Sequence, residues 1–305
     1  MFSEVVVVGQ IARDLVVEVP EASVTQRPEL LGGKGAHQAV ALSQLGVAVS
    51  LVGVVGQDAA GDALRARARA DRIGTTHVVR RPDTETALIV DVVDDRGRRR
   101  YLEHVPDATL VTETDVFAAA APISAAGSLI VQLQQPAPAA LLAARLAHTA
   151  GTRVVLDGVP GDGTFATELL ALADVVRAGD REAELLTGQP VDDVASAARA
   201  AADLRRRGPS VVVLEVAGQG NLFAGRAESW FVPHVETEVV DPTGAGDALV
   251  AALTAALTRR RPLETAACLA VAAAAATTEH AGGRPHLSRA DLDRLQPRAL
   301  EAVHA

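Results

Sequence analysis

Two carboxylates and two glycines occur together in DPTGAGD, residues 241–247, directly before the helix-forming run ALVAALTAALTRR. Gly244 and Gly246 allow the backbone to approach a ligand closely. The first amides of a helix have no acceptor within it, and they lie at the positive end of its dipole. The amides of residues 244–247 therefore predict a binding site for an anion such as a phosphate.

A carboxylate inside such a site is not there to bind the anion. Asp247 instead suits a general base, which takes a proton from a hydroxyl as that hydroxyl attacks phosphorus. A second interpretation stays open at this point: Asp241 or Thr243 caps the helix, and the glycines only form a tight turn.

A second glycine-rich segment, LGGKGAHQAVALSQLG, occupies residues 31–46. Lys34 adds a cation to the glycines, and residues 36–45 are predicted to form an amphipathic helix that Gly46 ends. The spacing is not that of a Walker A loop, and residues 5–9 do not continue into a dinucleotide-binding fingerprint. Taken alone, this segment favours a plain strand-to-helix connection over a binding loop.

Short Val-rich runs recur along the chain and are typical of strands buried on both faces of a parallel sheet. They lie at residues 5–8, 51–55, 129–133, 154–156 and 211–214. Segments of helical length lie between many of them, at residues 58–72, 137–149 and 191–207. This alternation predicts one α/β domain over residues 1–305, with a doubly wound, mainly parallel sheet flanked by helices.

Two regions depart from this pattern. Residues 15–19 and 87–101 alternate polar and apolar side chains, and the DDRG segment at 94–97 is a turn signal. We expect antiparallel strands here, inserted at about 11–31 and 87–105 as a small flap over one end of the sheet. After Thr243 the chain is predicted to be almost entirely helical.

The composition excludes several classes of protein. The net charge is −9 and aromatic residues make up 2%, which argues against a nucleic-acid partner. The single cysteine excludes an internal disulfide framework and a Cys-rich zinc site. The longest apolar run, residues 266–276, is too short to span a membrane, and the N-terminus lacks a secretory pattern, so we expect a cytoplasmic protein.

Together, the two glycine-rich segments resemble the signatures of the ribokinase-like, or PfkB, family of carbohydrate kinases. The family patterns G-G-K-G-A-N-Q and D-T-x-G-A-G-D-x-F appear here as residues 32–38 and 241–249. The resemblance extends to an early G-x-I-x-x-D ending at Asp14 and a central EAELLTG at 182–188. It implies a ribokinase-like fold with a small β-strand lid.

The resemblance also implies roles for individual residues. It makes Asp247 the catalytic base, with anion-hole amides from Gly244, Ala245 and Gly246. It implies that the acceptor is bound by Asp14, Gly32, Gly33, Lys34, His37 and Gln134. It places beside the nucleotide Thr243, Ala217, Gly218 and Gly220. It implies that Mg²⁺ is held through water by Glu182, and that a monovalent cation such as K⁺ lies near Asp241, Thr243, Thr277, His280 and Gly282.

Several positions depart from the family patterns. His37 and Gly179 stand where the two signatures have asparagine, and Gln134 replaces a residue that is often acidic. Leu249 stands in place of phenylalanine, and His286 in place of a small polar residue. These changes leave the base and the anion hole intact, but they put ribose itself in doubt as the acceptor.

The resemblance thus implies an ATP-dependent kinase that phosphorylates a hydroxyl of a small carbohydrate, as a homodimer that pairs through its lid. Two alternatives stay open: a nucleoside or sugar-phosphate kinase of the same family, and a sugar-binding relative without turnover. Arg13, Arg98 and Arg100 could hold a phosphate on the acceptor, or they could belong to a solvated flap surface.

Overall fold

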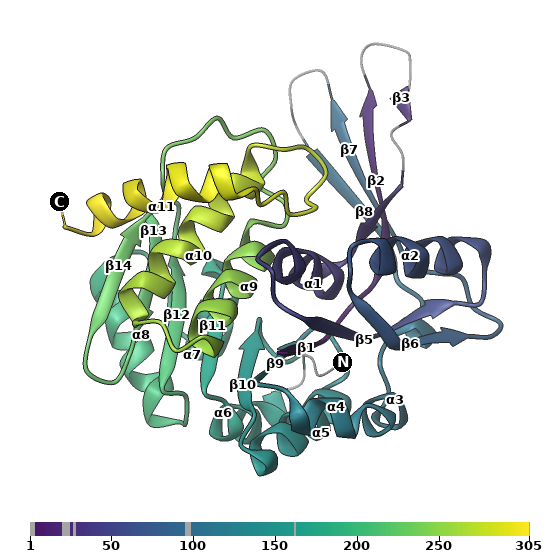
Figure 1. The fold of residues 1–305 in the computed structure, drawn as a ribbon. Coiled ribbons are helices and arrows are strands. Elements are labelled where there is room, and N and C mark those ends of the chain that lie inside the picture. The colour runs from purple at the N-terminus through teal and green to yellow at the C-terminus, as the bar shows by residue number, and fades with distance from the viewer. Residues whose placement is uncertain (1–3, 20–24, 27–28, 95–98, 162, 305) are drawn as a thin grey trace.

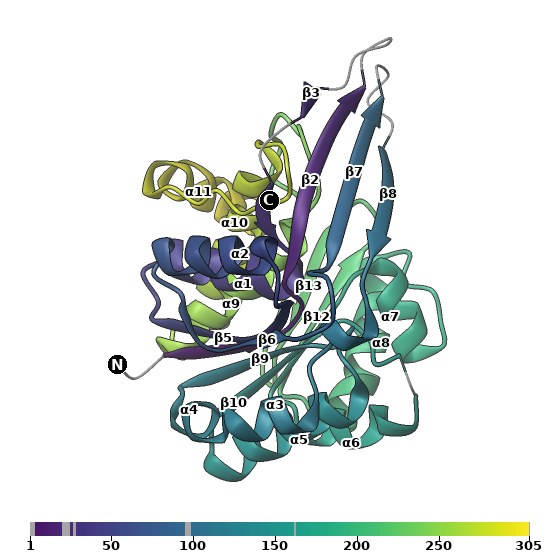
Figure 2. The same ribbon diagram turned by 90° about the vertical axis from the view of Figure 1, so that its right-hand side faces the viewer.

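The computed structural model describes residues 4–19, 25–26, 29–94, 99–161 and 163–304. They form two sheets, a large one between two layers of helices and a small one that extends from its edge (Figures 1 and 2). The expected turn at residues 94–97 lies mostly outside the described residues, as does Arg98. No described helix is long and apolar enough to cross a membrane.

The large sheet is parallel over seven strands and ends in an antiparallel hairpin. In spatial order its strands are β14 (Ser229–Pro233), β13 (Gly220–Ala224), β12 (Val211–Val216), β11 (Val175–Ala178), β10 (Arg153–Asp157), β9 (Ser128–Gln132), β1 (Val5–Val8), β5 (Val49–Gly56) and β6 (Gly74–Arg81). The predicted doubly wound, mainly parallel sheet is confirmed, and each of the five Val-rich runs overlaps a strand.

Helices cover both faces of this sheet (Figure 2). One face is covered by α1 (Lys34–Gln44), α2 (Ala59–Ala70), α9 (Ala245–Thr258), α10 (Leu263–Thr278) and α11 (Arg289–His304). The other is covered by α3 (Glu113–Ala118), α4 (Ala120–Ala125), α5 (Ala137–Ala150), α6 (Ala166–Leu172), α7 (Asp180–Thr187) and α8 (Val194–Arg206). Short 3₁₀ turns lie at η1 (Asp107–Thr109) and η2 (Gly163–Phe165).

Strand β1 shows why apolar runs suit this fold. Val5 and Val7 belong to the core cluster on one face, whereas Val6 and Val8 belong to the cluster on the other. Because successive side chains of a strand point to opposite faces, a strand covered on both sides must be apolar at every position.

The small sheet contains β2 (Ala12–Val19), β3 (Thr25–Gln26), β4 (Leu30–Gly32), β7 (Leu88–Asp94) and β8 (Arg99–His104). Its location confirms the expected second sheet, but the expectation of purely antiparallel pairing was wrong. β2 and β7 pair in parallel, with Arg13 opposite Leu88 and Val19 opposite Asp94. Both strands leave the large sheet in the same direction (Figure 2), β2 soon after β1 and β7 after β6, so they run side by side in the same sense.

The alanine-rich helices α9 and α10 pack against each other. Ala251, Ala252, Ala272 and Ala273 are all 0% exposed. Side chains this small allow two helices to lie close together, so the position of α9 relative to the sheet depends on the absence of larger groups.

We predict that Ala252→Leu lowers the free energy of unfolding by about 1–3 kcal/mol, because three added carbons have no space in a closed helix interface. Denaturant unfolding measures the change. Ala202→Leu, at an exposed position of α8, is the matched control and should stay within about 0.5 kcal/mol of the unchanged protein. Equal effects of the two substitutions would contradict close packing at Ala252.

Candidate active site

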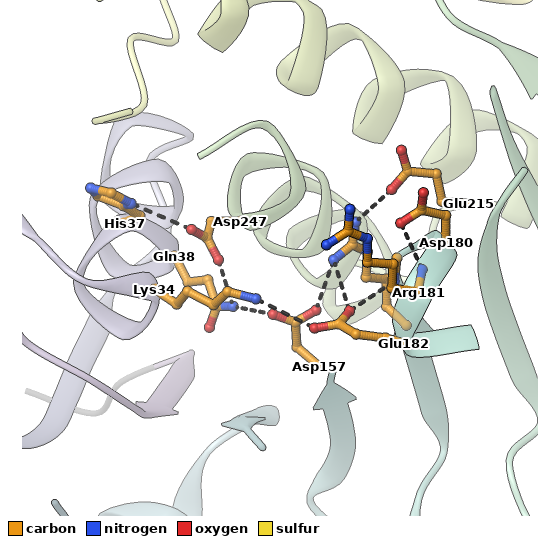
Figure 3. A network of polar contacts seen from close by, with 11 residues as sticks. Lys34, His37, Gln38, Asp157, Asp180, Arg181, Glu182, Glu215 and Asp247 are labelled. Carbon is orange, nitrogen blue, oxygen red and sulfur yellow. Dashed lines mark hydrogen bonds and ion pairs between the residues drawn. The ribbon is translucent and has the colours of Figure 1, made fainter. Parts of the chain in front are cut away.

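The polar groups gather at the carboxyl ends of the parallel strands. Gln132 ends β9, Asp157 ends β10, and Arg177 and Glu215 lie one residue before the ends of β11 and β12. In open α/β sheets, ligands bind in the crevice outside these strand ends. Helix α9 begins above the same edge and brings Asp247 to it (Figure 3).

The start of α9 is uncapped. Its N-cap residue is Gly244, with φ of 75°, and no described side chain accepts a hydrogen bond from the first turn. A Cβ at Gly244 would fall 1.8 Å from the carbonyl oxygen of Gly283, so the position requires glycine. Neither Asp241 nor Thr243 caps the helix. The amide of Ala245 makes a long hydrogen bond of 3.4 Å to the carbonyl of Pro242, and the first turn still offers amides to an anion.

Asp241 has a different role in the same loop. Its carboxylate accepts hydrogen bonds from the amides of Thr243 (2.9 Å) and Gly282 (2.8 Å). These bonds connect the approach to α9 with the loop after α10. Asp241 is fully buried, so they also satisfy a charge that would otherwise be costly to bury.

Two cavities meet at the start of α9. One, of about 170 Å³, is lined by Asp14, Lys34, His37, Thr243, Gly244 and Asp247, and by residues of the small sheet. The other, of about 330 Å³, is lined by Pro242, Ala245, Gly246 and Leu249, and by residues of β11 to β13 and α10. Each of residues 242–247 therefore lines one of the two cavities.

Asp247 lies in a chain of buried polar side chains (Figure 3). Gln38 donates from Nε2 to Asp247 Oδ1 at 3.2 Å and to Asp157 Oδ2 at 2.8 Å. On the other side, His37 Nδ1 lies 3.4 Å from Asp247 Oδ2, and His37 Nε2 lies 3.0 Å from Asp14 Oδ2. Helix α1 supplies both His37 and Gln38, so it fixes the orientation of the Asp247 carboxylate.

The imidazole of His37 is positively charged. Burial alone would lower its pKa, but the carboxylates of Asp14 and Asp247 outweigh burial and raise the pKa to about 9. Nδ1 lies within hydrogen-bond distance of Asp247, and Nε2 is close to Asp14 without hydrogen-bond geometry, so the charge of the protonated ring is what the two carboxylates favour.

A second charged cluster lies beyond Gln38. The side chain of Lys34 lies 3.5 Å from Glu182, and Arg177 lies 3.5 Å from Asp157, 3.5 Å from Glu215 and 3.7 Å from Glu182. Burial raises the pKa of Asp157 to about 6, although Arg177 and Lys34 oppose the shift. Burial also acts to raise the pKa of Glu182, but Lys34 and the amide of Gly179 outweigh it, and the pKa is lowered.

The structure brings most of the predicted residues to one of these cavities. The smaller cavity includes Gly33, Gln134, Asp241 and Gly282 in addition to those named above. Gly32 lies against the Asp14 carboxyl, where a Cβ would fall 2.0 Å from Asp14 Cγ.

Other predicted residues lie elsewhere. Thr243, which was expected beside the nucleotide, lines the smaller cavity and not the larger one. The turn with Ala217 and Gly218 is exposed and lines neither cavity, and Gly220 begins β13. Thr277 is buried at the end of α10, and the His280 ring lies 4.3 Å from that of His286.

Sequence reasoning missed a group of lining residues. From the small sheet, Ile89, Asp91, Tyr101 and Glu103 line the smaller cavity, and the Tyr101 hydroxyl contacts that of Thr243. Arg177 was missed as well, although a lone arginine in a Val-rich strand could have drawn attention to it, because buried charges are rarely unpaired.

The chain belongs to the pfkB family of carbohydrate kinases, because the family model matches residues 3–289. It is 28% identical to ribokinase of Haemophilus influenzae, over 91% of this chain and 93% of that one. It is 31% identical to ribokinase of Mus musculus, over 82% of this chain and 80% of that one. A solved structure of Arabidopsis thaliana ribokinase, complexed with ribose and ATP, has a TM-score of 0.81 and 25% identity, and covers 97% of this chain and 99% of that one.

We predict that stability falls as pH rises from 7 to 10, because His37 then loses its proton. The folded pKa of about 9 exceeds the ordinary value of 6.5, so the contribution is complete below pH 6.5 and is lost as pH rises through 9. A shift of this size corresponds to a free energy of unfolding on the order of 3 kcal/mol. The titration of Asp157 near pH 6 lies below this range.

Thermal unfolding at pH 7 and pH 10 measures the loss. A comparison of variants separates the contribution of His37 from that of other groups that change with pH. His37→Gln should lose less stability between the two pH values than the unchanged protein does. His148→Gln, at an exposed position, should keep the full loss. An identical loss in all three would contradict a charged His37.

Proposed function

We propose that the protein is an ATP-dependent kinase that transfers the γ-phosphate to a hydroxyl of a small, uncharged carbohydrate. The observation that carries this proposal is the position of Asp247, in the first turn of an uncapped helix between two cavities. The smaller cavity would hold the acceptor and the larger one the nucleotide. The γ-phosphate would then lie at the amides of Gly244, Ala245 and Gly246.

The proposed step is a direct displacement. The acceptor hydroxyl gives its proton to the Asp247 carboxylate, and its oxygen forms a bond to the γ-phosphorus. The bond from that phosphorus to the β,γ-bridging oxygen breaks, and ADP leaves with the electron pair. The α9 amides stabilise the charge on the transferred group, which is the largest contribution that a protein makes to such a step.

Asp14 and His37 would orient the acceptor. The Oδ1 atom of Asp14 is buried and has no hydrogen-bond partner among the described residues, whereas Oδ2 faces His37. Asp14 lines the smaller cavity, and an unpartnered carboxylate oxygen is suited to accept a hydrogen bond from a sugar hydroxyl. His37 would keep Asp14 and Asp247 at a fixed separation, so that one hydroxyl is held while another reacts.

Among the described residues no group of three acidic, histidine or cysteine side chains is placed to hold a metal ion directly, so a magnesium ion would bind largely through water. Glu182 supplies a carboxylate of the kind that Mg²⁺ prefers, and Mg²⁺ commonly keeps several waters. When bound, it would neutralise charge on the nucleotide phosphates. We propose that Glu182 holds it through water, and that a monovalent cation such as K⁺ reinforces the loop connection made by Asp241.

The charge of the smaller cavity favours an acceptor without a phosphate. Its described lining contains no arginine, and Lys34 and His37 already face carboxylates. The acidic residues in the lining are Asp14, Asp91, Glu103, Asp241 and Asp247. A sugar phosphate would be repelled there. The volume, 170 Å³, lies below the range of about 300–1,000 Å³ that is typical for drug-sized ligands, which favours a single sugar over a nucleoside.

Assembly and location are also proposals. Tyr101 and Leu102 on β8 are 47% and 54% exposed, which supports a homodimer that pairs through the small sheet. Partners other than the acceptor and ATP are not proposed. The cytoplasmic location stays a prediction from the sequence.

We predict that Asp247→Asn lowers kcat by about 10²–10⁴, the usual contribution of general-base catalysis. The amide keeps the shape of the carboxylate, so folding and ATP affinity should be retained. Coupled ADP release measures turnover, and calorimetry measures ATP binding. Asp293→Asn, an exposed position on α11, should leave kcat unchanged. Near-normal turnover in Asp247→Asn would refute the assigned base.

We predict that a panel of acceptors will show turnover with an uncharged sugar and not with sugar phosphates. Ribose, 2-deoxyribose, fructose phosphates, adenosine and cytidine, each with ATP and Mg²⁺, separate the classes by ADP release. Preference for a fructose phosphate would contradict the charge argument, and preference for a nucleoside would contradict the size argument. Sugar binding in calorimetry with no ADP release across the panel would support a relative that binds without turnover.

A further inference from the structure

Arg177 is a buried cation that neither family signature includes. It lies on β11, and 7% of its surface is exposed. It lines the larger cavity together with Ala245 and Gly246. Among the described residues of that lining it is the one arginine or lysine, and His234 is the remaining basic side chain.

The guanidinium of Arg177 packs directly against the first turn of α9. A Cβ on Gly246 would fall 2.9 Å from Arg177 Nη2, 3.0 Å from Nη1 and 3.1 Å from Cζ. A side chain at residue 246 would require the guanidinium to move, so glycine permits this close contact. The guanidinium and the amides at the positive end of α9 are therefore adjacent, and both face the cavity that would hold the nucleotide.

The protein contacts of the guanidinium are long. Its ion pairs with Asp157, Glu182 and Glu215 measure 3.5 Å, 3.7 Å and 3.5 Å, whereas charge-assisted hydrogen bonds are usually about 2.7–2.9 Å. Its Nε is buried and has no hydrogen-bond partner among the described residues. Arginine has five N–H donors, so this side chain retains donor capacity for an additional acceptor.

Gly179 lies next to the guanidinium and to two of its carboxylate partners. A Cβ at Gly179 would lie 3.8 Å from Arg177 Nη2, 3.3 Å from Glu182 Oε2 and 3.5 Å from Glu215 Oε2. A longer side chain at residue 179 would project into the region that the guanidinium and these carboxylates occupy. The missing side chain at 179 and the arginine at 177 are thus two parts of one local arrangement.

We propose that Arg177 binds the terminal phosphate of the nucleotide, from the side of the Gly246 amide opposite Asp247. This inference rests on the proposed kinase function and assigns it a further catalytic residue. Arg177 would donate hydrogen bonds to phosphate oxygens while Asp247 takes the acceptor proton. Bidentate donation by a guanidinium suits a phosphate, whose oxygens match the spacing of its N–H groups. The carboxylates would hold Arg177 in place before the nucleotide arrives.

A purely structural role for Arg177 is the competing explanation, because three carboxylates surround it. The two roles differ in how they affect the affinity for nucleotides with different numbers of phosphates. A phosphate ligand changes the affinity for ATP and leaves that for AMP nearly unchanged. A structural support changes both, or neither.

The test compares Arg177→Met, Arg177→Lys and the control Arg207→Met. Arg207 is a half-buried arginine whose Nη1 donates to the Leu186 carbonyl, away from both cavities. Calorimetry gives Kd for ATP, ADP and AMP, and coupled ADP release gives kcat and KM for the acceptor found in the panel. Thermal unfolding shows whether each variant is folded.

We expect Arg177→Met to weaken ATP binding by about 10–100-fold, as the loss of a charged hydrogen bond does, with AMP binding within about threefold of normal. Its kcat should fall by about 10²–10³, with the acceptor KM unchanged. Arg177→Lys keeps the charge but lacks the paired N–H donors of the guanidinium, so it should bind ATP more tightly than Arg177→Met and less tightly than the unchanged protein. Because lysine can still face the carboxylates, this variant also provides the test if Arg177→Met does not fold.

Suppose that the unchanged protein binds nucleotides and a folded Arg177 variant keeps the same ratio of ATP to AMP affinity. That result overturns this inference and leaves the proposed function standing. Weakening of ATP and AMP by equal factors overturns it as well, and assigns Arg177 a structural role. Absence of nucleotide binding in the unchanged protein overturns the proposed function and this inference with it.

Discussion

The uncapped N-terminus of α9 is the constraint on which the rest of the arrangement depends. A carboxylate that is 6% exposed, as Asp247 is, is costly to bury unless other groups compensate for its charge. Gln38 and His37 provide that compensation from α1, and both side chains are themselves buried. The first-turn amides of α9 are left without a side-chain cap. A proton acceptor and a set of amide donors for an anion thus lie within one helical turn, between two cavities.

The large sheet and its helices could be predicted from the sequence because strands covered on both faces must be apolar throughout, as β1 is. The start of α9 could be predicted because glycines precede a run of Ala and Leu, and Asp247 does lie in its first turn. The choice between capping and anion binding could not be made from the sequence, because both use these residue types. Pairing within the small sheet could not be predicted, since the sense of β2 relative to β7 depends on how both strands leave the large sheet. Arg177 could not be assigned either, because its contacts come from β10, β12, α7 and α9, which only the folded chain brings together.

Charge is distributed unevenly about α9. On the side of the smaller cavity, His37 lies between two carboxylates, and the lining is acidic overall. On the other side, the guanidinium of Arg177 lies against Gly246. This distribution suits an uncharged acceptor on the first side and a polyanion on the second. His37 and Gly179, which depart from the family patterns, both have a local explanation: His37 joins Asp14 to Asp247, and Gly179 leaves space beside Arg177.

The most direct measurement is a crystal structure of the complex with a non-hydrolysable ATP analogue and an acceptor sugar. The account predicts an acceptor oxygen about 2.6–3.2 Å from the Asp247 carboxylate, with the terminal phosphate at the amides of Gly244, Ala245 and Gly246. A terminal phosphate bound away from the start of α9, or an Asp247 carboxylate that contacts His37 and Gln38 but no acceptor oxygen, would contradict it.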